Sequence, residues 1–425
     1  MNRMVGFALM AIFFVLIDFY VWQAIKLLIR STSISTQRII AFGFWGFTVF
    51  SILSIVAIFT YMPMSAPVKA SFRTFLMAGI FIIYISKIFS VLVLIIDDLI
   101  RFGKWVVNYF QGNSAVAQMA NDGLQPAAEK ISRSEFLAKT ALTIGGLHAG
   151  GMAWGILSGA HDYRVRNVTL RIKNLPKQFD GMKIAQLSDI HSGSFFNKTA
   201  VKGGVEMLMK EKPDMFFFTG DLVNNIAPEV KDYIDIFSKI KAPLGTFSTL
   251  GNHDYGDYTQ WESPEKKIQN LKDLMNAHKT MGWDLLMDDH RAVKVDGESI
   301  GILGIQNWGA GNFAKYGNLE KAQQNAHDLP VKLLLSHDPS HWRNQVLDKH
   351  KDIDVAFAGH THGMQYGVEL GNFKWSPVQL RYKEWAGLYQ ENDQKLYVNR
   401  GFGYIGYPGR LGILPEIAIF ELKVG

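Results

Sequence analysis

The chain has 425 residues, of which 48% are hydrophobic and 19% charged, so it is neither a disordered chain nor composed like a typical cytosolic enzyme. It contains no cysteine, which excludes disulfides, thiolate zinc sites and cysteine nucleophiles. The net charge of +6 comes from residues 1–160, which hold 12 Lys and Arg against 6 Asp and Glu, whereas residues 161–425 hold 32 of each. Because basic residues flank membrane spans, this excess indicates a membrane, and no nucleic-acid partner is expected.

Three long apolar runs at the start of the chain predict transmembrane helices. A bilayer core of about 30 Å needs about 20 apolar residues in a helix, and only a helix satisfies its own backbone in lipid. The runs cover about Val5–Leu27, Ile39–Val68 and Thr74–Ile96, so we expect three spans within residues 1–100. The lipid bilayer is therefore an expected partner of this chain.

A fourth hydrophobic segment, residues 136–160, follows a predicted polar linker at residues 101–135. Its uncharged part, Thr140–Ala160, contains six glycines, which are common in membrane helices but costly in soluble ones. We interpret the segment as a fourth transmembrane helix. An uncleaved or re-entrant segment is the alternative.

Basic residues near the span ends predict the orientation of the chain. Eight Lys and Arg lie in the first and third connections, and three lie in the N-terminus and the second connection. Since cytoplasmic loops carry the excess of basic residues, the N-terminus is predicted outside. With four spans in a bacterial inner membrane, residues 161–425 are then non-cytoplasmic. If the fourth run does not span, they are cytoplasmic.

Asp18 and Lys87 are charged residues inside predicted spans. Each is the fourteenth residue of its apolar run, and the first and third spans run in the same direction, so the two charges are expected at similar depth. Isolated charges at bilayer depth are costly and usually pair. We therefore predict an ion pair that ties the first helix to the third. The alternative is that either side chain reaches the membrane surface.

From residue 161 the pattern changes to short apolar runs that alternate with amphipathic stretches, such as Lys198–Lys212 and Pro264–Met281. Short apolar runs bounded by Gly or Pro are typical of buried strands. Residues 161–425 are therefore predicted to form an α/β domain. The predicted strands are Met182–Leu187, Met215–Phe218, Gly245–Leu250, Ile300–Ile305, Val331–Leu335, Ile353–Ala358, Lys395–Val398 and Glu416–Glu421.

Asp, His and Asn residues recur directly after five of these strands. The carboxyl ends of strands form the usual ligand crevice of an open α/β sheet, so we expect these side chains at one edge. Their donor atoms are all oxygen and nitrogen, which suit Mn, Fe, Zn or similar divalent metals. Seven ligands are too many for one tetrahedral zinc and fit two ions that share a bridging carboxylate. The set is Asp189, His191, Asp221, Asn252, His337, His360 and His362.

The order of these motifs resembles the calcineurin-like metallophosphoesterase superfamily. The extension Gly363-Met364-Gln365 and the tail Asn399-Arg400-Gly401…Pro415-Glu416 resemble its membrane-associated bacterial branch. The resemblance covers roughly residues 165–425. It implies two packed mixed β-sheets flanked by helices, placed after transmembrane helices that lie outside the resemblance. The matching pieces are Asp189-Ile190-His191, Gly220-Asp221, Gly251-Asn252-His253-Asp254, His337 and Gly359-His360-Thr361-His362.

The resemblance also implies the roles of these residues around two divalent metal ions, taken to be Mn, Fe or Zn. A hydroxide that bridges the two ions would attack phosphorus in line. His253 would protonate the leaving group or stabilise charge in the transition state, and Asp254 would orient its imidazole. One ion would be held by Asp189, His191, Asp221 and His362, and the other by Asp221, Asn252, His337 and His360.

The predicted function is that of a membrane-anchored enzyme that hydrolyses a phosphodiester, phosphomonoester or pyrophosphate. Membrane tethering favours a lipid-linked substrate, and similar bacterial enzymes of lipid A synthesis split UDP-diacylglucosamine. That substrate requires a cytoplasmic active site, whereas the four-span topology fits an exported phosphodiesterase or phosphatase better. The alternative function is a membrane sensor or transporter whose phosphoesterase-like domain binds metal without catalysis.

Overall fold

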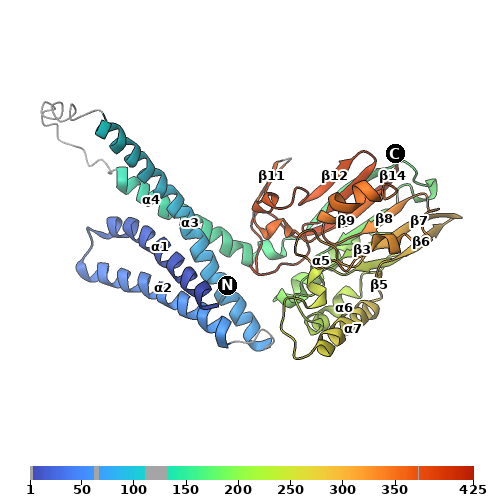
Figure 1. Ribbon diagram of the computed structural model, residues 1–425, viewed down its shortest axis with the longest axis horizontal. Helices are drawn as coiled ribbons and strands as arrows, with labels where there is room; N and C mark the ends of the chain where they lie inside the picture. The colour runs from blue at the N-terminus through green and yellow to red at the C-terminus, as the bar shows by residue number, and fades with distance from the viewer. Residues whose placement is uncertain (1–2, 62–66, 111–132, 372) are drawn as a thin grey trace. The chain divides into compact units, whose positions relative to one another are not determined.

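The computed structural model describes residues 3–61, 67–110, 133–371 and 373–425 (Figure 1). These residues form two compact units, which divide between Ala153 and Trp154. The first unit is helical. The second unit is an α/β domain that contains all the predicted site residues.

The helical unit has a helix at each of the first three predicted spans. Among the described residues, three helices are long and apolar enough to cross a membrane, and the fourth helix, α4, is not one of them. This leaves the fourth span a prediction. The helices are α1 (Arg3–Ile29), α2 (Ile34–Tyr61), α3 (Pro67–Phe110) and α4 (Arg133–Leu157).

The helix ends differ from the sequence boundaries at two places. Helix α2 ends at Tyr61, so Val68 of the predicted second run belongs to α3 instead. Helix α3 continues through Phe110 into the predicted linker, so the first acidic residue after the apolar run does not end the helix. Asp97 pairs with Arg101 one turn later, at 2.7 Å. The central part of the predicted linker, residues 111–132, lies outside the described residues.

The predicted ion pair between the first and third helices is confirmed. Lys87 Nζ lies 2.5 Å from Asp18 Oδ1, and the Asp18 side chain is completely buried. The other carboxylate oxygen accepts hydrogen bonds from Thr48 at 2.6 Å and from Tyr84 at 2.8 Å. One buried carboxylate therefore joins α1, α2 and α3.

We expect Lys87→Met to destabilise the helical unit, because it leaves the Asp18 carboxylate buried without its cation. Removing one partner of a buried pair costs on the order of 3 kcal/mol, whereas removing both is often tolerated. The double variant Asp18→Asn/Lys87→Met should therefore recover most of the loss. Thermal unfolding in detergent measures this, with the exposed Lys104→Met as the matched control. Additive effects of the two single changes would contradict the coupling.

Two six-stranded sheets form the framework of the α/β domain, as predicted. The first sheet consists, in spatial order, of β1 (Arg164–Ile172), β14 (Glu416–Val424), β2 (Lys183–Leu187), β3 (Met215–Thr219), β4 (Thr246–Thr249) and β5 (Asp284–Leu285). The second consists of β12 (Gly387–Glu391), β13 (Gln394–Val398), β9 (Val355–Ala358), β8 (Lys332–Leu335), β7 (Glu298–Gly304) and β6 (Asp289–Val295).

Both sheets are mixed. Strands β2 to β5 run parallel, and β14 lies antiparallel to β2 and parallel to β1. In the second sheet β7, β8, β9 and β13 are parallel, and β6 and β12 close the edges in antiparallel register. The parallel central strands of both sheets explain why their carboxyl ends can meet at one edge of the domain. A separate two-stranded ribbon consists of β10 (Val368–Leu370) and β11 (Phe373–Trp375).

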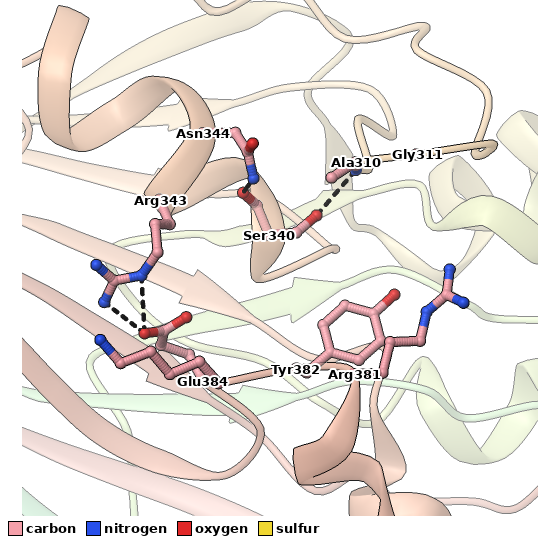
Figure 2. Close-up of a pocket in the computed structure, with 9 residues that line it drawn as sticks. Ala310, Gly311, Ser340, Arg343, Asn344, Arg381, Tyr382 and Glu384 are labelled. Carbon is pink, nitrogen blue, oxygen red and sulfur yellow. Dashed lines mark hydrogen bonds and ion pairs between the residues drawn. The ribbon is translucent and has the colours of Figure 1, made fainter.

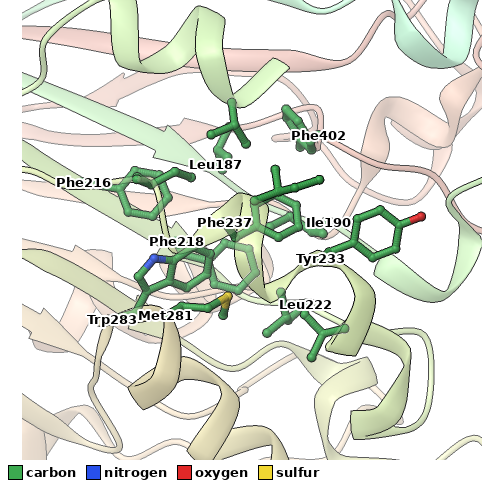
Figure 3. Close-up of a cluster of buried hydrophobic side chains, with 14 of the residues drawn as sticks. Leu187, Ile190, Phe216, Phe218, Leu222, Tyr233, Phe237, Met281, Trp283 and Phe402 are labelled. Atoms are coloured by element: carbon green, nitrogen blue, oxygen red, sulfur yellow. The ribbon is translucent and has the colours of Figure 1, made fainter. Parts of the chain in front are cut away.

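Alternate side chains of the central strands enter different hydrophobic layers. In β3, Met215 and Phe217 pack between the two sheets, whereas Phe216 and Phe218 pack under helices on the outer face. Figure 3 shows this outer layer, where Trp283 packs among the aromatic rings. A strand buried on both faces needs a continuous apolar run, which explains why β3 was predicted so closely.

Helices complete a four-layer arrangement. The outer face of the first sheet is covered by α5 (Lys198–Lys210), α6 (Ile234–Phe237) and α7 (Pro264–Met281). Helix α8 (Leu319–Ala322) and the helical segment around Trp342 cover the second sheet. The predicted helix Pro264–Met281 has the same bounds as α7. It begins after Ser263, whose side chain accepts a hydrogen bond from the Lys266 backbone.

The burial of His278 predicts that acid lowers the stability of the domain. It is fully buried in α7 with Nδ1 3.0 Å from Ser248 Oγ, and burial lowers its pKa to about 3. An unfolded chain binds a proton at histidine near pH 6.5, so between about pH 6.5 and 3 the unfolded state holds one proton more. The free energy of unfolding should therefore fall with falling pH by about 1.4 kcal/mol per unit. His278→Asn should have a shallower dependence of thermal midpoint on pH, and identical slopes would contradict this role.

Candidate metal centre

The seven predicted ligands converge at the carboxyl ends of five strands. Asp189 and His191 follow β2, and Asp221 follows β3. Asn252 follows β4, and the second sheet contributes the remaining three residues after β8 and β9. The seven residues fall into two adjacent groups, one centred on His362 and one on His337.

The first group consists of Asp189, His191 and His362, all of them buried. The Nε2 atoms of the two histidines are 3.0 Å apart. Oδ1 of Asp189 lies 3.2 Å from Nε2 of His362. Two imidazole nitrogens and a carboxylate oxygen therefore face a common point, as the ligands of a divalent cation do.

The second group consists of Asp221, His337 and His360, and Asn252 lies among them. Oδ1 of Asn252 is 2.8 Å from Nδ1 of His360 and 3.1 Å from Nε2 of His337. Nε2 of His337 is in turn 3.2 Å from Oδ2 of Asp221. This second group again contains only nitrogen and oxygen donors.

Asp221 links the two groups through a single atom. Its Oδ2 lies 3.2 Å from Nε2 of His337 in the second group and 3.5 Å from Nε2 of His191 in the first. Its Oδ1 accepts the backbone N–H of His253 at 2.9 Å, which fixes the orientation of the carboxylate. This is the placement that a bridging carboxylate requires.

The backbone is unusual at five of the seven residues. Their φ angles lie between 48° and 70°, in the left-handed region that side chains other than glycine rarely adopt. Such conformations persist where the surrounding structure enforces them, and they cluster at functional sites. Each left-handed residue here turns a side chain at a strand end toward the shared point. The five are Asp189, His191, Asp221, His360 and His362.

Hydrogen bonds to the outer nitrogens orient two of the imidazoles. Nδ1 of His337 donates to the Thr219 carbonyl at 2.7 Å, which directs Nε2 at the site. Nε2 of His360 is 2.8 Å from the Tyr382 hydroxyl, so Nδ1 is the nitrogen that faces the site. Such outer contacts fix the tautomer of metal-binding histidines. The donor set and its orientation therefore fit two divalent cations.

The electrostatics of the site also favour cations. Burial alone would lower the pKa of His337, but the Asp221 and Asp189 carboxylates and the Thr219 carbonyl together outweigh burial and raise that pKa to about 10. Burial would raise the pKa of Asp189, but His362 beside it lowers the pKa below its usual range. Two buried carboxylates thus favour positive charge around them, which divalent metal ions supply.

His253 lies beside the first group and outside both. Its ring is 5.0 Å from the ring of His191. Its Nδ1 donates to the carbonyl of Asn224 at 2.7 Å, so Nε2 is the nitrogen that remains for substrate. This placement agrees with the expected position next to the metal ligands.

The expected role of Asp254 is wrong in one respect, because its carboxylate does not orient His253. It is fully buried and accepts hydrogen bonds from four backbone N–H groups at 2.8–3.2 Å. These groups belong to the loops that carry Asp221 and Asn252. Asp254 therefore fixes loops, and the Asn224 carbonyl fixes the imidazole. The donors are the N–H groups of Asp221, Leu222, Val223 and Gly251.

Comparisons with known proteins establish the family. A family described as calcineurin-like phosphoesterase matches residues 182–364, which include all seven candidate ligands. A second, described as probable calcineurin-like phosphoesterase, transmembrane domain, matches residues 2–160. A Bacillus subtilis protein named as an uncharacterized metallophosphoesterase, YkuE, is 30% identical over 305 residues, which cover 69% of this chain and 99% of that protein. The chain belongs to the calcineurin-like metallophosphoesterases.

Other relatives include membrane proteins and one enzyme with a named substrate. A zebrafish (Danio rerio) transmembrane protein with metallophosphoesterase domain is 27% identical, over 64% of this chain and 60% of that protein. The UDP-2,3-diacylglucosamine pyrophosphatase LpxG of Chlamydia trachomatis is 27% identical, over 54% of this chain and 81% of that protein. This metallophosphoesterase thus spans nearly all of the Bacillus protein but less than two thirds of the zebrafish one.

A pocket of about 340 Å³ lies beside the candidate metal centre of this metallophosphoesterase (Figure 2). Tyr382, which contacts His360, is part of its lining. Arg343 also lines it, but its guanidinium is held by Glu384 at 2.5 Å. The Arg381 guanidinium lies 5.7 Å from the Phe313 ring centre. The pocket thus offers a polar wall next to the second group of ligands.

The sequence did not indicate two tyrosines of this site. Tyr382 bonds Nε2 of His360, and the Tyr258 hydroxyl accepts a hydrogen bond from Asn252 Nδ2 at 2.9 Å. Tyr258 lies near Asn252 along the chain, which is a weak signal of proximity. Tyr382 lies well beyond His362 on another loop, and no spacing in the sequence places it there.

Proposed function

We propose that this metallophosphoesterase is a membrane-anchored hydrolase with a dinuclear centre that cleaves a phosphoester or pyrophosphate. The observation that carries the proposal is the single oxygen of Asp221 that faces both groups of ligands. Two ions at these groups would lower the pKa of a water molecule and neutralise charge on the phosphoryl oxygens. Mn, Fe and Zn suit these donors, which include five imidazoles or amides and two carboxylates.

The residues of the chain have distinct tasks in this proposal. Asp221 sets the separation of the ions, and the outer contacts of His337 and His360 hold their rings in place. In its doubly protonated form His253 directs Nε2–H at the leaving oxygen and donates that proton to it, while its Nδ1–H stays on the Asn224 carbonyl and the ring is left neutral. Asp254 holds together the loops that carry Asp221 and Asn252, through hydrogen bonds from their backbone N–H groups.

A lipid-linked substrate is the proposed class. Three apolar helices tie the domain to a membrane, which supports a substrate held in the same membrane. The Chlamydia relative is named for a lipid-linked pyrophosphate, and a pyrophosphate of that kind is our specific candidate. A bacterial inner membrane is the proposed location.

We further propose that α4 is a fourth span, which places the domain on the non-cytoplasmic side. Close packing of α4 against α3 supports this. Ser90 Oγ donates to the Ala141 carbonyl at 2.8 Å, and Gly145 lies so close to Ser86 and Ser90 that a Cβ would collide with them. Small residues at such an interface are typical of membrane helices. A C-terminal reporter fusion that is active only in the cytoplasm would contradict this topology.

Metal-dependent hydrolysis of bis-p-nitrophenyl phosphate tests the function. The full chain in detergent, stripped with a chelator, should be inactive and should recover activity with about two equivalents of Mn²⁺. Asn252→Ala should lose most of that activity, whereas Asn276→Ala, an exposed change on α7, should retain it. Full metal occupancy without hydrolysis of diesters, monoesters or pyrophosphates would favour the sensor or transporter alternative.

A further inference from the structure

The ribbon of β10 and β11 has its apolar side chains on the outside. Val368 lies opposite Trp375, and Leu370 lies opposite Phe373, so the four side chains share one face. Leu370 is 71% exposed and Phe373 is 61% exposed, and the other two are exposed as well. We call these four side chains the ribbon face. A surface strand pair normally presents its polar side chains to water instead.

Charged side chains occupy the inner face of the same ribbon. Glu369 lies opposite Lys374. The Glu369 carboxylate accepts hydrogen bonds from Arg166 at 2.7 Å and from Arg400 at 2.8 Å. The Lys374 ammonium lies 4.9 Å from the centre of the Tyr389 ring. These contacts fix the register, and a shift by one residue would exchange the faces. The outward placement of the apolar side chains is therefore enforced by the structure.

The segment that follows the ribbon contacts the loops of the candidate metal centre. Ser376, directly after β11, donates to the carbonyl of Gly363, which follows His362. Tyr382, a few residues later, contacts His360. Two further apolar side chains on these connections are exposed, and one of them is exposed by 88%. They are Met364 and Leu380.

We propose that the ribbon face lies in the surface layer of a phospholipid bilayer. Three helices of the same chain are long and apolar enough to span a membrane, so a bilayer is always within reach of the domain. Phe and Trp with Leu and Val suit the boundary between headgroups and acyl chains. Arg381 and Lys383, in the segment that follows β11, are exposed, and their charges complement anionic lipid phosphates.

The size of the ribbon face argues against a second copy of the chain as its occupant. Stable protein interfaces bury about 800 Å² on each partner, which four side chains on two three-residue strands do not supply. A lipid surface needs no such minimum, because a few apolar side chains add to an attachment that the helices already provide.

This placement also defines the substrate class, a step that rests on the proposed function. With the ribbon face in lipid, the loops of His360 and His362 lie at the membrane surface. A phosphoester can then reach the ions while its acyl chains remain in the bilayer. The substrate inferred is an amphipathic phosphoester rather than a soluble one.

Site-specific labelling tests the contact independently of activity. The chain has no cysteine, so Leu370→Cys in the full chain can carry one environment-sensitive fluorophore. In phosphatidylcholine–phosphatidylglycerol vesicles, lipids brominated on their acyl chains should quench it about five-fold more than a fluorophore at Ile268→Cys. Ile268 is an exposed apolar residue on α7 and serves as the matched control. Equal quenching at the two positions, or a blue shift at position 370 without lipid quenching, would overturn the proposal.

A charge introduced on the ribbon face tests whether lipid contact is needed for hydrolysis of an amphipathic substrate. Phe373→Glu should lower hydrolysis of a p-nitrophenyl ester of a diacylglycerol phosphate in vesicles by about ten-fold. It should leave turnover of soluble bis-p-nitrophenyl phosphate unchanged, which also shows that the variant folds. Equal rates of the variant and of Ile268→Glu on the vesicle substrate would overturn the substrate class. If the unmodified chain hydrolyses no diester, monoester or pyrophosphate, the proposed function fails, and the labelling result still decides the lipid contact.

Discussion

Asp221→Asn is expected to abolish hydrolysis and to reduce bound metal to one ion or less per chain. The variant keeps the size of the side chain and the acceptor for the His253 backbone N–H, but it loses the negative charge between the two groups. A neutral amide cannot offset the repulsion between two divalent cations. We expect turnover of bis-p-nitrophenyl phosphate to fall by a factor on the order of 10³ or more.

Metal analysis and activity on the same preparation check this result. Asp273→Asn, an exposed change on α7, is the matched control and should keep both the metal and the turnover. A second variant, Gly251→Ala, displaces the same carboxylate without changing Asp221 itself. A Cβ at Gly251 would collide with Asp221 Oδ1. We expect it to impair the site with Asp221 itself intact. Asp221→Asn with two tightly bound ions and unchanged turnover would exclude the bridging role.

The strands that carry the site could be predicted because they are buried on both faces. Such strands are continuous apolar runs, as in β3 and β8, and the polar residue that follows each one marks its end. The edge strand β1 was not predicted, since Arg164–Ile172 alternates polar and apolar residues and lies on only one side of the core. Sequence pattern thus identified the elements that position the ligands better than those that frame them.

The contacts between loops could not be predicted, because they join residues far apart in the chain. The sequence Asn252-His253-Asp254 suggested that Asp254 serves its neighbour, yet a tight turn directs the carboxylate to backbone N–H groups instead. The ribbon of β10 and β11 was missed for a related reason. Its inner face depends on Arg166 and Arg400, which are distant in sequence from Glu369. Left-handed φ angles at the ligands are also invisible in residue type alone.

His253→Ala is expected to lower turnover by about 10² to 10³ while both ions remain bound, because the imidazole lies outside the two groups of ligands. If Nε2 protonates the leaving oxygen, the loss depends on the leaving group. A p-nitrophenolate leaves without much help, whereas an alkoxide needs the proton. The variant should therefore lose distinctly more activity on an alkyl phosphodiester than on bis-p-nitrophenyl phosphate.

The dependence on leaving group separates the two roles considered for His253. Equal losses on the two esters would assign the imidazole to charge stabilisation, since that contribution acts on the phosphoryl oxygens whatever group departs. Loss of metal would assign the imidazole instead to the support of His191, whose ring lies 5.0 Å from it. His327→Ala, at an exposed position, is the matched control and should leave both rates unchanged. Alanine keeps the backbone N–H, so the variant should retain its metal. Proton transfer by the imidazole then requires a larger loss of turnover on the alkyl ester than on bis-p-nitrophenyl phosphate.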